Sequence, residues 1–192
     1  MTRARLEAFS DGVIAILITI MVLELHIPQG ATLAALRPVL PIFLAYLLSF
    51  VILGIYWNNH HHMFHLVDSI GGGILWANLH LLFWLSLIPV TTGWIGKNGF
   101  APWPTAVYGM VLLGAGIAYF ILVNVIIHHQ GESSKLRAAV QRDFKGKISI
   151  VIYAVAVALA FVRPWMADAL YVSVALMWLI PDPRIESRVQ RH

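Results

Sequence analysis

The sequence predicts an all-α, polytopic membrane protein with six transmembrane helices, and three observations support this fold class. Hydrophobic residues make up 59% of the 192 residues and charged residues only 11%, whereas about a quarter of the residues in a soluble domain are charged. Six segments are apolar over membrane-spanning or nearly membrane-spanning lengths. None of them shows the alternation of a β-strand, and only helices or closed barrels satisfy their backbone hydrogen bonds in lipid.

The segments are counted against a bilayer core about 30 Å thick, which requires about 20 apolar residues in a helix. In chain order they are residues 8–27, 38–57, 74–95, 104–127, 147–162 and 165–180. The last two are short and are separated only by Arg163 and Pro164, which predicts a tight helical hairpin. The longest polar stretch, about 128–147, is too short to fold alone, so residues 1–192 are predicted to form a single six-helix transmembrane domain.

Small and charged residues refine several of these segments. Arg3 and Arg5 precede the first apolar run in the manner of a secretory signal, but acidic residues interrupt the run and no small-residue cleavage site follows, which predicts a retained helix.

Three glycines at 71–73 predict a turn before the third segment. Gly109, Gly114 and Gly116 predict close helix packing in the fourth. Cysteine is absent, which excludes disulfides and thiolate metal sites.

Lysine and arginine in the connections predict the orientation. With the N-terminus in the cytoplasm, the cytoplasmic parts hold ten of these cations: Arg3, Arg5, Lys135, Arg137, Arg142, Lys145, Lys147, Arg184, Arg188 and Arg191. The outer loops hold three: Arg37, Lys97 and Arg163. Because cytoplasmic loops carry the excess of positive charge, we expect a multi-pass protein of the cell membrane with both termini in the cytoplasm. The net charge of +4 then needs no nucleic-acid partner.

The first segment is flanked by carboxylates. The uncharged run between Asp11 and Glu24 covers residues 12–23, which span about 18 Å as a helix. A charge at membrane depth costs several kcal/mol unless it is paired or hydrated. We therefore expect this helix to lie against protein or water rather than to be surrounded by lipid.

An apolar stripe runs along this first helix. With about 100° per residue, a face roughly 100° wide collects six residues: Gly12, Ile16, Thr19, Ile20, Leu23 and Ile27. Ser10 and Asp11 point to the far side. Two accounts fit the stripe, a packing seam against another helix and a hydrophobic constriction in a pore, and periodicity does not choose between them.

A motif at the start of this helix adds a family resemblance. The residues RLEAFSDG at 5–12, with Arg5, Phe9, Ser10, Asp11 and Gly12, resemble the Arg-x-x-x-Phe-Ser-Asp signature of the transmembrane protein 175 potassium-channel family. Further matches are WNNHHHMF at 57–64, LW at 75–76, NL at 78–79 and LIP at 87–89. The likeness covers about the first half of the chain, and beyond residue 100 it rests on the number and topology of the segments.

The resemblance implies a potassium-selective cation channel whose first helix lines the pore. Such channels lack a glycine-rich carbonyl filter, and no Thr-Val-Gly-Tyr-Gly run occurs here. A single six-helix repeat implies a homotetramer, and four stripes around an axis can enclose an ion path where one cannot. By motif position, Ile16 would form the narrowest ring, Ile20 and Leu23 the next layers, and Thr19 would place a hydroxyl beside it. The implied partners are further copies of the chain, the lipid bilayer and permeant potassium ions, with no cofactor.

The polar residues of the motif are expected to support the pore helix. Ser10 and Asp11 would meet groups on the second and third helices, for which the candidates are His60, His61, Asn78 and His80. Arg5 would either pair with an acidic group or face the cytoplasmic mouth. Whether Glu24 faces the outer entrance of the pore stays open at this point.

Two other functional classes fit parts of the sequence. Four clustered histidines, His60, His61, His62 and His65, are typical of sites for zinc, iron or copper, and membrane di-iron oxygenases are rich in such motifs. Few carboxylates accompany them, so we predict neither an enzyme nor a metal site. The alternative function is a proton-coupled cation transporter, with Asp11 and His80 relaying protons.

Overall fold

The computed structural model describes residues 2–131, 134, 136–137 and 144–179, and all regular structure within these ranges is helical. Five of the cations in the predicted charge count lie outside the described residues: Lys135, Arg142, Arg184, Arg188 and Arg191. The same holds for residue 180 at the end of the sixth predicted segment.

The helices follow the predicted order. They are α1 (Arg3–Met21) with the short 3₁₀ helix η1 (Val22–Glu24), η2 (Leu33–Val39) with α2 (Leu40–His65), α3 (Gly72–Ser86), α4 (Ile88–Lys97), α5 (Pro102–Gln130), α7 (Phe144–Leu159) and α8 (Pro164–Leu179). Among the described residues, α1 with η1, η2 with α2, α3 with α4, and α5 are each long and apolar enough to cross a membrane. With the shorter α7 and α8, they form the six segments of an all-α, polytopic membrane protein.

Helix ends coincide with residues that satisfy or remove backbone hydrogen bonds. The Thr2 hydroxyl accepts a bond of 3.4 Å from the backbone N–H of Arg5 at the start of α1, as N-cap residues do. Pro102 opens α5, where its missing N–H leaves no helical bond unmade. Gly131 follows α5 with φ of +67°, a left-handed conformation that glycine adopts without strain.

The third predicted segment, residues 74–95, is interrupted in the structure. α3 ends at Ser86 and α4 begins at Ile88. Pro89 cannot donate a backbone hydrogen bond, and its ring clashes with the carbonyl four residues earlier. The helix is therefore broken at Leu87, near the middle of the segment. The second segment is longer than predicted, because α2 continues through the histidines to His65.

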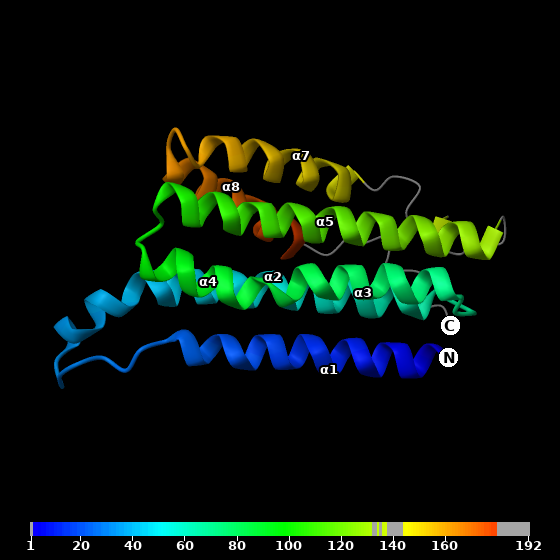
Figure 1. Ribbon diagram of the computed structural model, residues 1–192, viewed down its shortest axis with the longest axis horizontal. Coiled ribbons are helices and arrows are strands. Elements are labelled where there is room, and N and C mark those ends of the chain that lie inside the picture. The colour runs from blue at the N-terminus through cyan, green and yellow to red at the C-terminus, as the bar shows by residue number, and fades with distance from the viewer. Residues whose placement is uncertain (1, 132–133, 135, 138–143, 180–192) are drawn as a thin grey trace.

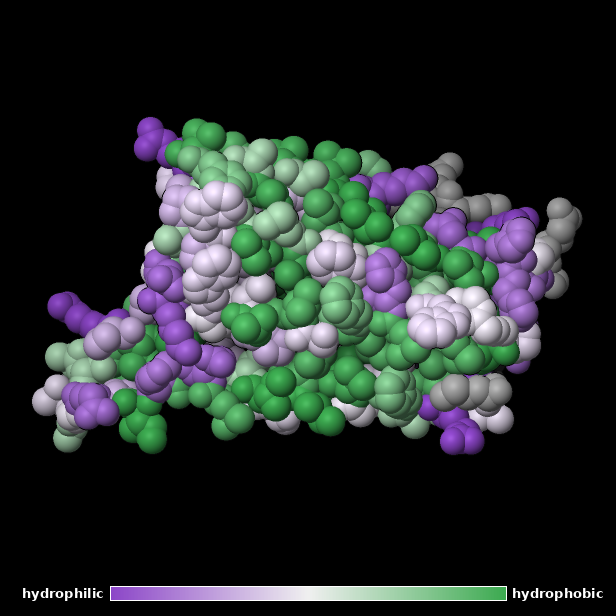
Figure 2. Space-filling view, in the orientation of Figure 1, coloured by the Kyte–Doolittle hydropathy of each residue, from purple (hydrophilic) through white to green (hydrophobic). Residues whose placement is uncertain are grey.

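The helices lie side by side, with α1 along one edge of the bundle and α7 with α8 at the opposite edge (Figure 1). α1 contacts α2, α3 and α4. Apolar side chains cover most of the middle of the molecule in the view of Figure 2, and polar side chains gather towards its two ends. This distribution matches a protein whose middle lies in hydrocarbon and whose ends lie in water.

Two of the three glycines predicted to permit close packing are in tight contact. A Cβ atom at Gly114 would overlap the ring of Trp84 on α3, and one at Gly109 would overlap the hydroxyl of Tyr171 on α8. At Gly116 the nearest atom would be 3.6 Å away, which is an ordinary contact. The fourth segment therefore packs against its neighbours at the first two positions in a way that larger residues would prevent.

Candidate functional site

One face of α1 packs into the bundle. Its buried residues recur every three or four positions: Leu6, Ser10, Ile14, Leu17 and Met21. They meet α2, α3 and α4, the elements that α1 contacts. This spacing is that of a helix with a single face towards the core.

The apolar stripe lies on the other side of α1, and its side chains are exposed. Ile16 is 60% exposed and Leu23 is 80% exposed; Gly12, Thr19 and Ile20 are exposed as well. The Thr19 hydroxyl donates to the carbonyl of Ile16 at 2.9 Å. Within the described part of the chain, the stripe is therefore not a packing seam against another helix.

Two further residues of the motif extend this exposed stripe towards the N-terminus. At about 100° per residue, Phe9 and Arg5 each project within about 20° of Ile16. Phe9 is 49% exposed and Arg5 is exposed. Among the described residues, Arg5 has no ion-pair partner. The predicted stripe began at Gly12 and so omitted these two positions, which the same angular count identifies.

The opposite face carries a buried chain of hydrogen bonds. The Asn78 side-chain N–H donates to the Ser10 hydroxyl at 2.9 Å, and the Ser10 hydroxyl donates to the Leu6 carbonyl at 2.9 Å. The Asn78 Oδ1 lies 2.8 Å from His60 Nε2. Since Oδ1 can only accept, Nε2 carries the proton in this arrangement. The chain joins α1, α3 and α2, and its three polar side chains are at most 1% exposed.

Asp11 is held by a tryptophan rather than by a histidine. The indole N–H of Trp57 on α2 donates to Asp11 Oδ1 at 3.1 Å. Trp57 belongs to the motif region at 57–64 but was not among the predicted partners of Asp11. The indole N–H of tryptophan can only donate and an ionised carboxylate can only accept. A tryptophan in the motif region was therefore a possible partner for Asp11.

Two of the four candidate partners lie outside this chain of bonds. His80 accepts from the Trp84 indole at 3.0 Å, one turn further along α3. It projects about 200° from Asn78 and so faces away from α1. His61 projects about 100° from His60 and pairs instead with His65, with their Nε2 atoms 3.0 Å apart. Asp11 and His80 thus bond to separate tryptophans, and the structure does not join them into a proton relay.

Glu24, whose direction the sequence left open, turns towards α4. Its Oε2 lies 2.7 Å from Nζ of Lys97. A Cβ atom at Gly93 would come within 2.8 Å of the same oxygen, so the carboxylate rests against the glycine surface of α4. The ion pair connects the end of η1 to the end of α4.

The side chains that could hold a metal lie at the other end of α1. Glu7 on α1 and His61 and His65 on α2 place one ligand atom each within 4.8 Å of one another. The sequence offered few carboxylates to the histidine cluster, and Glu7 was not among the candidates because it belongs to a different helix.

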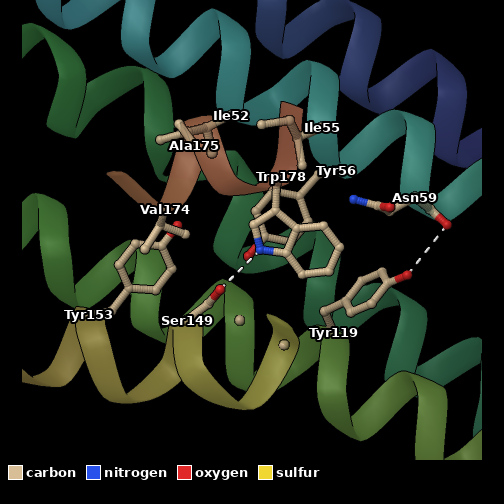
Figure 3. Close-up of a pocket in the computed structure, with 12 residues that line it drawn as sticks. Ile52, Ile55, Tyr56, Asn59, Tyr119, Ser149, Tyr153, Val174, Ala175 and Trp178 are labelled. Carbon is tan, nitrogen blue, oxygen red and sulfur yellow. Dashed lines mark hydrogen bonds between the residues drawn. The ribbon is translucent and has the colours of Figure 1, made fainter. Parts of the chain in front are cut away.

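A separate cavity of about 50 Å³ lies between α2, α5, α7 and α8 (Figure 3). At its wall the Trp178 indole donates to the Ser149 hydroxyl at 3.0 Å. The Tyr119 hydroxyl donates to the Asn59 carbonyl at 3.4 Å. None of its lining residues belongs to α1, so the cavity is not part of the site on α1.

These features define a class, a multi-pass helical membrane protein whose first helix exposes an apolar stripe and is anchored on its back by buried polar bonds. Residues 5–89 match the family model described as "Endosomal/lysosomal potassium channel TMEM175". A potassium channel of Chryseobacterium sp. (strain P1-3) is 57% identical over 192 residues, the full length of both chains. A potassium channel of Chamaesiphon minutus is 30% identical over 178 residues, which cover 85% of this chain and 86% of the relative.

A solved structure gives the same result for the fold. The crystal structure of a lysosomal potassium-selective channel TMEM175 homolog from Chamaesiphon minutus superposes with a TM-score of 0.81 and 28% sequence identity, covering 93% of this chain and 96% of that chain. The chain belongs to the TMEM175 family. This is a family of ion channels and not a class of enzymes.

Proposed function

We propose that this chain is a subunit of a potassium-selective cation channel in which four copies surround a central axis with the stripe of α1 facing the ion path. The observation that carries the proposal is the bare stripe: Ile16 and Leu23 are 60% and 80% exposed although both are hydrophobic. Two bacterial relatives at 57% and 30% identity are named as potassium channels, which supports potassium as the permeant ion.

The stripe suits a hydrophobic constriction. A ring of four isoleucine side chains at Ile16 would pass ions by size and by control of wetting, as hydrophobic constrictions do. Ile20 and Leu23 would form layers about one and two turns further along. This arrangement takes the place of a carbonyl filter.

The polar bonds on the back of α1 supply the rigidity that such a constriction requires. Asn78 holds Ser10 at 2.9 Å and Trp57 holds Asp11 at 3.1 Å. Ser10 and Asp11 both lie more than about 100° from Ile16 around the helix, so these bonds fix the rotation of α1 without entering the ion path. The role proposed for the motif is therefore to hold α1 in the rotation that turns the stripe towards the ion path.

The orientation proposed is that of the cation count, with both termini in the cytoplasm of a cell membrane and residues 1–192 as one six-helix domain. The N-terminal end of α1, with Arg5 and Phe9 on the stripe, would then form the cytoplasmic mouth. Glu24 and its partner Lys97 would lie near the outer surface.

Potassium flux into liposomes tests the activity. Purified protein in liposomes with a potassium gradient and no proton gradient should develop a membrane voltage that follows the potassium ratio. Flux that strictly requires a proton gradient would overturn the channel proposal and support the proton-coupled transporter.

Replacement of Ile16 tests the constriction. Ile16→Asn adds a polar group to the proposed narrowest ring, and we expect a several-fold higher potassium flux or a lower preference for potassium over sodium. The matched control is Ile117→Asn on α5, where the isoleucine is 40% exposed but lies on a helix away from α1. Equal flux and selectivity in wild type and Ile16→Asn would remove Ile16 from the constriction.

Single cysteines test the tetramer, because the chain has none of its own. A cysteine introduced by Leu23→Cys would face its copies across the axis, and a flexible bifunctional thiol reagent should yield cross-linked species in detergent. The control Ile117→Cys should stay uncross-linked at the same protein concentration. Identical cross-linking of both variants would overturn the axial position of the stripe.

A further inference from the structure

Three potential metal ligands converge where α1 begins and α2 ends. His61 and His65 are one turn apart on α2, so both rings project from the same face. Glu7 projects about 180° from Ile16 around α1, towards α2 and away from the stripe. One ligand atom from each of the three side chains lies within 4.8 Å of the other two, and the two Nε2 atoms are 3.0 Å apart.

These distances suit a transition-metal ion. Zinc binds histidine nitrogen at about 2.0–2.1 Å and carboxylate oxygen at about 2.0–2.2 Å, in tetrahedral geometry. Two nitrogens on one such ion are about 3.3 Å apart, close to the 3.0 Å between the His61 and His65 Nε2 atoms. An ion could therefore replace the proton between the rings with side-chain adjustments alone, and water would complete the coordination.

One of the two carboxylate oxygens of Glu7 has no partner in the described part of the chain and is available to bind an ion. Its side chain is 17% exposed, and Oε2 lies 3.5 Å from Nε of Arg3. Oε1 is buried and has no hydrogen-bond partner among the described residues. A buried carboxylate oxygen without a partner is destabilising, and a cation bound at Oε1 would relieve that cost. His65 is exposed, which opens the group to ions from solution.

We propose that Glu7, His61 and His65 bind a divalent transition-metal ion such as Zn²⁺, which fastens the N-terminal end of α1 to the C-terminal end of α2. The proposal does not rest on ion conduction. The ion would also act on the anchor of α1, because the His61 ring stacks on Trp57 with ring centroids 6.1 Å apart and Trp57 donates to Asp11. Metal binding would thus hold the end of the helix that carries the stripe.

Metal titration tests the site. Protein freed of its affinity tag and stripped with a chelator is titrated with Zn²⁺ by calorimetry, and Co²⁺ is added in parallel because its visible absorption reports tetrahedral coordination. The variants are Glu7→Gln, which keeps the side-chain volume, and His65→Ala, at an exposed position. The matched control is His128→Ala, an exposed histidine on α5.

We expect one Zn²⁺ per chain in wild type and in His128→Ala, and at least about tenfold weaker binding in the other two variants, since even outer-sphere changes weaken metal sites by that much. Wild-type affinity and stoichiometry in His65→Ala, or no binding by wild type, would overturn the proposal. Weaker binding in His65→Ala but not in Glu7→Gln would place the ion on the histidines alone and overturn the link between α1 and α2. None of these outcomes depends on potassium flux.

Discussion

The buried bond between Ser10 and Asn78 can be tested by a double-mutant cycle. Ser10→Ala removes the hydroxyl that accepts from Asn78 at 2.9 Å. Asn78→Ala removes that donor and also the oxygen that lies 2.8 Å from His60 Nε2. The double variant removes both ends of the α1–α3 bond at once.

The structure sets the expected magnitudes. Asn78→Ala leaves the His60 Nε2 proton without its acceptor and the Ser10 hydroxyl without its donor, in a site where all three residues are at most 1% exposed, and each unsatisfied buried group costs about 1–3 kcal/mol. Ser10 keeps its bond to the Leu6 carbonyl, so its share lies at the low end and the total is about 2–4 kcal/mol. Ser10→Ala leaves only one Asn78 N–H unpartnered, at about 1–2 kcal/mol.

The two losses should not add. Interhelical hydrogen bonds in membrane proteins show coupling of about 0.6 kcal/mol on average and about 1.7 kcal/mol at most. Since this bond is fully buried, we expect the double variant to lose about 1 kcal/mol less than the sum of the single variants. Equilibrium unfolding in mixed micelles, followed by circular dichroism, measures all four free energies of unfolding.

Additivity within about 0.3 kcal/mol would refute the reasoning, because it would mean that Ser10 and Asn78 do not stabilise each other. The control cycle pairs Ser10→Ala with Ser149→Ala. Ser149 on α7 accepts from Trp178 on α8, and these two helices lie at the opposite edge of the bundle from α1 (Figure 1), so that pair should be additive.

Two further changes probe packing and the outer ion pair. Gly114→Ala should lower the free energy of unfolding by about 1–3 kcal/mol, because its Cβ would overlap the Trp84 ring, whereas Gly116→Ala has room at 3.6 Å; equal effects in thermal unfolding would contradict this packing. Glu24→Gln removes an ion pair whose Lys97 and Glu24 side chains are 47% and 37% exposed, so the loss should stay below about 1 kcal/mol. It should also shrink as salt is raised, and a larger loss that is independent of salt in the same assay would show that the pair is shielded from solvent.

Much of the fold was predictable because membrane helices are specified by local composition. The six-segment prediction is confirmed. Boundaries were predicted less well. The first helix begins at Arg3 and not at residue 8, and α2 ends at His65 and not at residue 57, because polar residues near a membrane surface continue a helix without appearing in an apolar count.

The partners of the motif residues could be predicted only in part. Asn78 and His60 do form a chain with Ser10, but His61 and His80 do not join it. Neighbouring residues in a helix differ by about 100° in direction, so a cluster in sequence is not a cluster in space. Only the rotation of α2 and α3 against α1 selects which of them reaches Ser10.

The sequence by itself determined the class of protein, the membrane segments and the stripe on the first helix, because hydropathy and helical period belong to a single segment and need no knowledge of its neighbours. The tertiary structure alone decided that the stripe is bare within the chain, that Trp57 holds Asp11, and that Glu7 meets His61 and His65. Those contacts depend on the relative rotation and depth of separate helices, which side-chain packing sets and no single segment encodes.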